Sequence, residues 1–158
     1  MAVVNIRDTG RNSAKTQDVR ALAEKVQKPS DTEAITAANT ITAAESGTRY
    51  VLNVAAAKIQ TLPAPAAGLE YWFYVGATEP TGTHTVVTAS SANIIVGNIS
   101  SPEDAAGSVA TVTDADTISF VASKAVHGDF AHVWSDGTNW YVDGMCKVQD
   151  GITTTQAG

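Results

Sequence analysis

The chain has 158 residues, of which 44% are hydrophobic and 16% are charged, and its formal net charge is −6. This length is enough for one domain with a packed core and leaves no room for a second domain of useful size. No segment approaches the roughly 20 apolar residues of a membrane helix, and residues 1–10 contain no apolar run typical of a secretory signal. We therefore expect a soluble protein, made in a cytoplasm and without a membrane partner.

The charge is divided unevenly along the chain. Residues 1–28 contain six Lys or Arg and three acidic residues, which gives this segment +3 and leaves −9 on the remainder. Because phosphate neutralisation requires a basic surface, the acidic body argues against nucleic acid as a partner. The basic segment is either a solvated tail or an arm that docks onto an acidic protein surface. The candidate docking residues are Arg7, Arg11, Lys15 and Arg20.

A single helical pattern occurs near the N-terminus, over residues 16–28. Apolar residues recur there at the spacing of one helix face, and Pro29 ends the helix. We expect this face to pack on the chain's own β-domain or on a second subunit, in cis or in trans. Residues 1–29 therefore form an arm with one short α-helix, and residues 30–158 form the main domain. The packing face consists of Val19, Leu22 and Val26.

From Ser30 onward the pattern changes to alternation of apolar and polar residues with many β-branched side chains, which is typical of strands. Turn sequences rich in Gly, Pro and Asp separate these segments. Short strands at regular spacing predict an all-β fold, namely a jelly-roll-like β-sandwich of about eight to ten strands, with a small barrel as the other possibility. The candidate strands cover residues 34–43, 49–54, 57–62, 69–77, 84–89, 93–98, 109–113, 117–123, 130–135 and 140–148.

The clearest local element is a hairpin whose turn contains Asp136, Gly137 and Asn139. Gly137 can adopt the positive φ that a tight turn requires, and the polar side chains beside it can bind the local backbone. Trp134 lies on the incoming strand and Trp140 on the returning strand. If their sides coincide, the two tryptophans pair across the hairpin.

A second aromatic segment lies within residues 69–77. Its central residues place large side chains on both faces of the predicted strand, and a strand of this kind is usually buried on both faces. One face would meet the core, and the other would need a cover such as the N-terminal helix, a long loop or another subunit. The candidate core or interface aromatics are Tyr71, Trp72, Phe73, Tyr74, Trp134 and Trp140.

Residues with the chemistry of catalysis or metal binding do not form a convincing pattern. His127, Asp129 and His132 have metal-ligand side chains, but their surroundings favour a turn followed by a strand. Residues 114–116 could bind calcium weakly, and an Asp-rich turn is the simpler interpretation. Cys146 has no partner for an internal disulfide and is predicted to be a buried structural thiol. We expect no enzyme activity, no bound metal and no cofactor.

Two regions carry a family resemblance. Residues 50–75 contain Tyr-Val-Leu-Asn, Ile-Gln-Thr-Leu-Pro and Gly-Leu-Glu-Tyr-Trp-Phe, and residues 118–144 contain Gly-Asp-Phe followed by Ser-Asp-Gly-Thr-Asn-Trp-Tyr-Val. In these regions the chain resembles small virion proteins of tailed bacteriophages, particularly capsid decoration (cement) proteins and related β-domains of head or tail fibres. The resemblance implies a β-sandwich or jelly-roll-like domain, oligomeric association and no catalysis.

The function expected from this resemblance is structural. Copies of the protein would decorate and stabilise the outer surface of a capsid by bridging subunits of the major capsid protein, and they would self-associate as a homodimer or homotrimer. The sequence has no long repeats or heptads, which disfavours a fibre shaft. The alternative is a fibre or receptor-binding module that holds a glycan on Trp134, Trp140 or Tyr141. A polysaccharide hydrolase is a third class, although no pair of carboxylates stands out for it.

Overall fold

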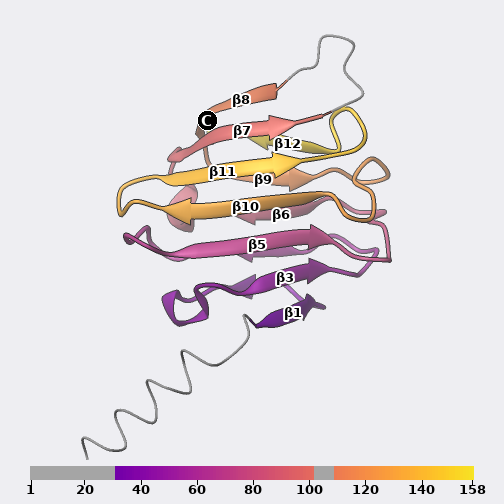
Figure 1. Cartoon of the computed structure of the whole chain (residues 1–158), viewed down its shortest axis with the longest axis horizontal. Helices are drawn as coiled ribbons and strands as arrows, with labels where there is room; N and C mark the ends of the chain where they lie inside the picture. The colour runs from indigo at the N-terminus through magenta and orange to yellow at the C-terminus, as the bar shows by residue number, and fades with distance from the viewer. Residues whose placement is uncertain (1–30, 102–108) are drawn as a thin grey trace, which may run out of the picture. The chain divides into compact units, whose positions relative to one another are not determined.

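The computed structural model describes residues 31–101 and 109–158, and these residues form a two-layered β-sandwich (Figure 1). The described strands make a seven-stranded sheet in the order β1-β3-β5-β10-β11-β7-β8 and a five-stranded sheet in the order β12-β9-β6-β4-β2. The prediction of an all-β sandwich is confirmed. The strands are β1 (Thr32–Ile35), β2 (Asn39–Thr40), β3 (Arg49–Leu52), β4 (Ile59–Thr61), β5 (Glu70–Val75), β6 (His84–Val87), β7 (Ile95–Ser100), β8 (Val109–Ala115), β9 (Thr117–Phe120), β10 (Phe130–Ser135), β11 (Trp140–Met145) and β12 (Ile152–Thr155), and two short 3-10 turns are η1 (Ala43–Glu45) and η2 (Ala89–Ser91).

Several sequence predictions lie outside the described residues. These are the helix over residues 16–28, its packing face and the basic docking residues of the arm. The residues concerned are Val19, Leu22, Val26, Arg7, Arg11, Lys15 and Arg20.

Most predicted strands are present, with small shifts at their ends. The strand predicted over residues 34–43 is divided into β1 and β2, because the chain leaves one sheet there and enters the other. The sequence analysis missed β12, which pairs with β9 in an antiparallel register. Its sequence, Ile-Thr-Thr-Thr, is β-branched throughout but too short to show alternation.

The first six strands alternate between the two sheets, and this explains their parallel pairing. β1, β3 and β5 are parallel neighbours in one sheet, while β2, β4 and β6 are parallel neighbours in the other. Each time the chain crosses to the opposite sheet and back, it re-enters the first sheet in the same direction. The core-facing side chains of β1, β3 and β5 therefore lie side by side. Ile35, Leu52 and Val75 are aligned in this way. Among the later strands, β10 pairs antiparallel with β5 and β11, while β11 is parallel to β7.

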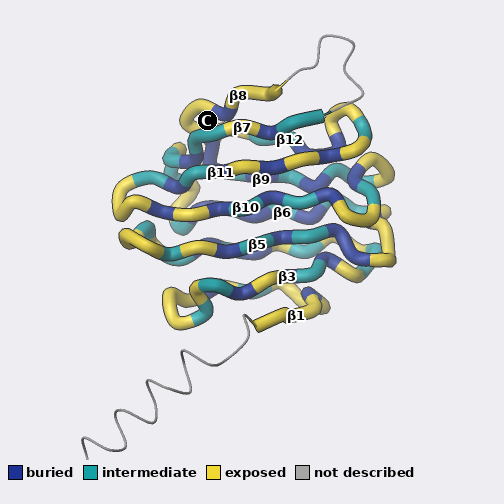
Figure 2. Tube along the Cα trace, viewed as in Figure 1, coloured by how far each residue is buried: buried dark blue, intermediate teal, exposed yellow. Residues whose placement is uncertain are grey.

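Large aromatic side chains fill the space between the sheets. Tyr50, Tyr71, Phe73 and Trp140 are fully buried, in agreement with the alternation of buried and exposed positions along the strands (Figure 2). Tyr50 stacks on Phe73 with ring centroids 5.3 Å apart, and Tyr71 packs against Trp140 at 5.9 Å. Burial raises the pKa of Tyr71 to about 12. Its hydroxyl therefore stays protonated and donates a hydrogen bond of 2.9 Å to the carbonyl oxygen of Thr42.

Two buried polar side chains fix loops to the sandwich. The backbone N–H of Lys58 donates to Nδ1 of His84 at 3.1 Å, so Nε2 carries the proton and donates to the carbonyl oxygen of Val54 at 2.8 Å. The carboxylate of Asp129 accepts hydrogen bonds from the backbone N–H groups of Val126, at 2.9 Å, and Lys147, at 3.0 Å. Because their polar atoms are satisfied by backbone groups, both residues have a structural role.

Candidate interaction surface

The two outward surfaces of the sandwich differ in chemistry. Side chains on the outside of the five-stranded sheet are mostly small hydroxyl residues, such as Thr61, Thr85, Ser119 and Thr153. Rings occupy the corresponding positions of the seven-stranded sheet. Since a solvent-facing sheet surface is normally polar, this second surface is the candidate functional site. We call it the aromatic face, and its rings belong to Trp72, Tyr74, Phe130, His132, Trp134 and Tyr141.

Strand register arranges the aromatic face in three rows that run across β3, β5, β10 and β11. The first row lies nearest the turn between β10 and β11, the second crosses the middle of the strands, and the third lies at their opposite ends. The first row contains Glu70, Trp134 and Tyr141, the second contains Arg49, Trp72, His132 and Asp143, and the third contains Val51, Tyr74, Phe130 and Met145.

Rings in neighbouring strands stack on one another. The centroids of Trp72 and His132 are 3.8 Å apart with 9° between the planes, and those of Trp134 and Tyr141 are 4.3 Å apart with 14° between the planes. In these two pairs each ring uses one of its faces for its neighbour. Trp134 is nevertheless 42% exposed.

Polar and charged groups lie among and beside these rings. Nε2 of His132 is 3.4 Å from a carboxylate oxygen of Glu70, and the two form an ion pair only when the imidazole is protonated. Arg49 and Asp143 are exposed at the two ends of the second row. The aromatic face therefore combines an apolar centre with charges of opposite sign on opposite sides.

The turn between β10 and β11 holds one end of the aromatic face in place. Gly137 has φ = +102°, as predicted, and one carboxylate oxygen of Asp136 accepts hydrogen bonds of 2.8 Å from the backbone N–H groups of Thr138 and Asn139. The other carboxylate oxygen accepts a hydrogen bond of 2.9 Å from the hydroxyl of Tyr141. Asn139 thus contributes backbone groups to the turn, and Asp136 orients the ring that stacks on Trp134.

We expect the carboxyl group of Asp136 to titrate below its ordinary pKa of 3.8, because the N–H groups of Asn139 and Thr138, and then the Tyr141 hydroxyl, bind its charged form. The contribution of Asp136 to stability is then complete above pH 3.8 and is lost as the pH falls through the lowered pKa. An NMR titration of the side-chain carboxyl carbon measures the midpoint. Tyr141→Phe should raise this midpoint, and a wild-type midpoint at or above 3.8 would contradict the expectation.

The condition for the two tryptophans to pair across the hairpin is not met. Trp134 lies opposite Tyr141, and Trp140 lies opposite Ser135. Four residues, 136–139, separate the paired ends of the strands, so the sides of the two tryptophans do not coincide. Trp140 belongs to the core, while Trp134 belongs to the aromatic face.

The predicted strand with large residues on both sides is β5, and its two sides have different roles. Tyr71 and Phe73 are fully buried in the core, and Trp72 and Tyr74 are half-buried on the aromatic face. Phe130 from the neighbouring strand packs against both outer rings, at 6.1 Å from Trp72 and 5.8 Å from Tyr74. Neighbouring rings therefore cover part of the second face.

Other candidate sites offer less chemistry. In the segments 31–101 and 109–158, no three His, Cys, Asp or Glu residues are grouped so that they could hold a metal ion. Asp129 is buried and bound to backbone groups, whereas His132 stacks on the opposite, outward side of the sheet. The part of the chain that the structure describes also contains no helix that could cross a membrane.

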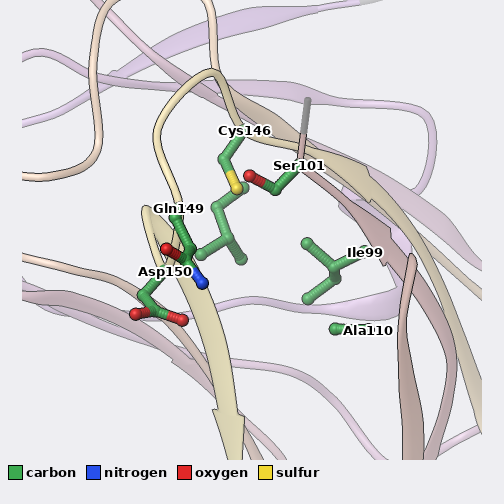
Figure 3. A pocket seen from close by; sticks show the side chains of 7 residues that line it. Ile99, Ser101, Ala110, Cys146, Gln149 and Asp150 are labelled. Atoms are coloured by element: carbon green, nitrogen blue, oxygen red, sulfur yellow. The ribbon is translucent and has the colours of Figure 1, made fainter. Parts of the chain in front are cut away.

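Cys146 is buried, as predicted, and its sulfur lies 3.8 Å from the carbonyl oxygen of Ser100. A cavity of about 120 Å³ lies beside it, between the ends of β7, β8 and β12 (Figure 3). This volume is below the roughly 300 Å³ at which ligand pockets begin. The cavity beside Cys146 is lined by Ile99, Ser101, Ala110, Cys146, Gln149, Asp150 and Ile152.

A second hollow, of about 340 Å³, lies at the β1–β2 connection and is lined mainly by small and polar residues.

Sequence reasoning did not include Arg49, Asp143 or Met145 in the site. Each lies on the outward side of its strand, next to a buried neighbour. Alternation alone therefore marked them as outward-facing, but only the strand order places them beside the rings.

No family model, curated protein or solved structure matches this chain.

Proposed function

We propose that this protein is a structural virion protein that decorates and stabilises the outer surface of a tailed-phage capsid by bridging neighbouring subunits of the major capsid protein. The observation that supports this proposal is the aromatic face, because rings gathered on the outward side of a sheet are typical of an interaction surface. The two regions that resemble phage virion proteins, residues 50–75 and 118–144, supply β5, β10 and most of β11 to this face.

In this proposal the two parts of the chain have separate tasks. The basic segment, residues 1–28, docks onto the shell protein, and the acidic body contacts neighbouring molecules on the particle. Contacts that are weak individually become strong when many are made on one lattice. The docking side chains are those of Arg7, Arg11, Lys15 and Arg20.

Binding of the full-length protein to undecorated shells tests this proposal. Replacing the four docking residues with Glu should abolish binding in a sedimentation assay, whereas Lys124→Glu on the body should leave it unchanged. Quantitative mass spectrometry of purified virions should give a copy number that scales with the number of shell subunits. Wild-type binding by the four-residue variant, or a copy number as low as that of a tail component, would overturn the proposal.

The alternative is a fibre or receptor-binding module that holds a glycan. The 42% exposure of Trp134 favours this alternative. Tyr141 already occupies one face of the Trp134 ring, which reduces the area on which a sugar could stack. Trp140 is fully buried and cannot contact a glycan. Binding of the protein to host surface polysaccharide, lost in Trp134→Ala, would favour this function over decoration.

A further inference from the structure

We propose that the partner of the aromatic face is a second copy of this chain, so that two seven-stranded sheets pack face to face about a two-fold axis. The axis lies in the contact plane, parallel to the strands and between β5 and β10. This inference rests on the proposed function in one respect, namely that the aromatic face is an interaction surface. The distribution of charge across the second row of the aromatic face indicates that this partner is a second copy of the chain.

The positions of the strands define the symmetry. β3, β5, β10 and β11 are consecutive in the sheet, so the midline of the aromatic face lies between β5 and β10. Because neighbouring strands are about 4.8 Å apart, β3 and β11 each lie about 7 Å from this midline, on opposite sides. A two-fold axis along the midline therefore places β3 of one copy opposite β11 of the other, and β5 opposite β10. Each row then faces the same row of the second copy.

Charges in the second row are complementary under this operation. Arg49 lies at the β3 end and Asp143 at the β11 end of the row, and both are exposed. In the dimer, Arg49 of each copy faces Asp143 of the other, which gives two equivalent ion pairs, as an isologous interface requires. A two-fold axis that crosses the strands along the second row would instead place Arg49 against Arg49. Since like charges in contact are unfavourable, the charge pattern selects the axis along the strands.

The third row matches in polarity. In the third row, Val51 of one copy faces Met145 of the other, and Tyr74 faces Phe130. The dimer would cover Met145, which is 41% exposed, and Trp134, which is 42% exposed. An apolar centre with charged ends is the usual composition of a specific interface.

The mass of the full-length protein in solution, measured by light scattering across a range of concentrations, tests this inference. The wild-type protein should be a dimer. Arg49→Glu places Glu against Asp143, and Asp143→Arg places Arg against Arg49, so each single variant should weaken dimerisation at least about tenfold. Lys124→Glu, which changes a charge outside the aromatic face, should have no effect. Circular dichroism identical to the wild type would show that each variant is folded.

Mixing the two single variants gives the decisive result. A heterodimer of Arg49→Glu with Asp143→Arg has opposite charges at both contact points, so an equimolar mixture should recover the dimer at concentrations where each variant alone is mostly monomeric. The double variant, with both changes in one chain, should also recover the dimer. A monomeric or trimeric wild type, or a mixture that stays monomeric, would overturn the inference.

Failure of the inference and failure of the proposed function give different results. A protein that is present on virions in shell stoichiometry but shows no charge-dependent dimer supports decoration and overturns the two-fold contact. A protein that forms the charge-dependent dimer but is absent from capsids supports the contact and overturns decoration.

Discussion

Replacing Trp140 with Ala should lower the free energy of unfolding by about 3–5 kcal/mol, the usual cost of removing a large buried aromatic side chain. Trp140 is 0% exposed and packs 5.9 Å from Tyr71. It lies on β11, between β10 and β7, so the vacated space has strands on both sides. Domains of this size are commonly stable by about 5–15 kcal/mol. Urea unfolding, followed by near-ultraviolet circular dichroism, measures the loss.

Two variants provide controls for this expectation. Trp134→Ala removes the same side chain from the aromatic face and should cost only about 0.5–1.5 kcal/mol, mainly through lost stacking on Tyr141. Trp140→Phe should fall between the two, because the indole N–H of Trp140 has no hydrogen-bond partner among the described residues. Trp140→Phe also allows the effects of changing Trp140 and Trp134 to be compared if Trp140→Ala does not fold. Equal losses for Trp134→Ala and Trp140→Ala would contradict the assignment of the two tryptophans to different faces.

Local features of the sandwich follow from the sequence, because their causes are local. The Asp136-Gly137 turn and the boundaries of β10 are predicted correctly, since a positive φ at glycine and an Asp side chain bound to nearby N–H groups need no distant partner. Alternation likewise separates Tyr71 and Phe73 from Trp72 and Tyr74. Alternation does not say which of two sides faces the core, so it cannot decide whether Trp134 and Trp140 lie on the same side of the sheet.

Features that depend on the order of strands were not available from the sequence. The parallel pairs of β1, β3 and β5 arise because the chain crosses to the other sheet between them, and a strand shows no sign of its future neighbour. The same limit applies to the candidate site. Arg49 and Asp143 come from different ends of the domain sequence, and only the order β3-β5-β10-β11 places them in one row.

Gly97 is the position where the smallest change should have the largest effect. Its φ is +143°, which side chains rarely adopt, and a Cβ atom added there would lie 2.0 Å from the carbonyl oxygen of Val142. The obstacle is backbone of the neighbouring strand, β11, so no side chain can rotate to relieve it. Gly97→Ala should therefore separate β7 from β11 and cost about 4 kcal/mol or more, a loss reserved for severe packing faults.

Gly47→Ala separates this clash from the strain of the backbone alone. Gly47 has φ = +89° and nothing within 4 Å of an added Cβ, so this variant should cost about 1–2 kcal/mol. Urea unfolding of both variants measures the difference, and loss of folded Gly97→Ala protein agrees with the expectation. If Gly97→Ala were as stable as Gly47→Ala, β7 could not approach β11 as closely as described.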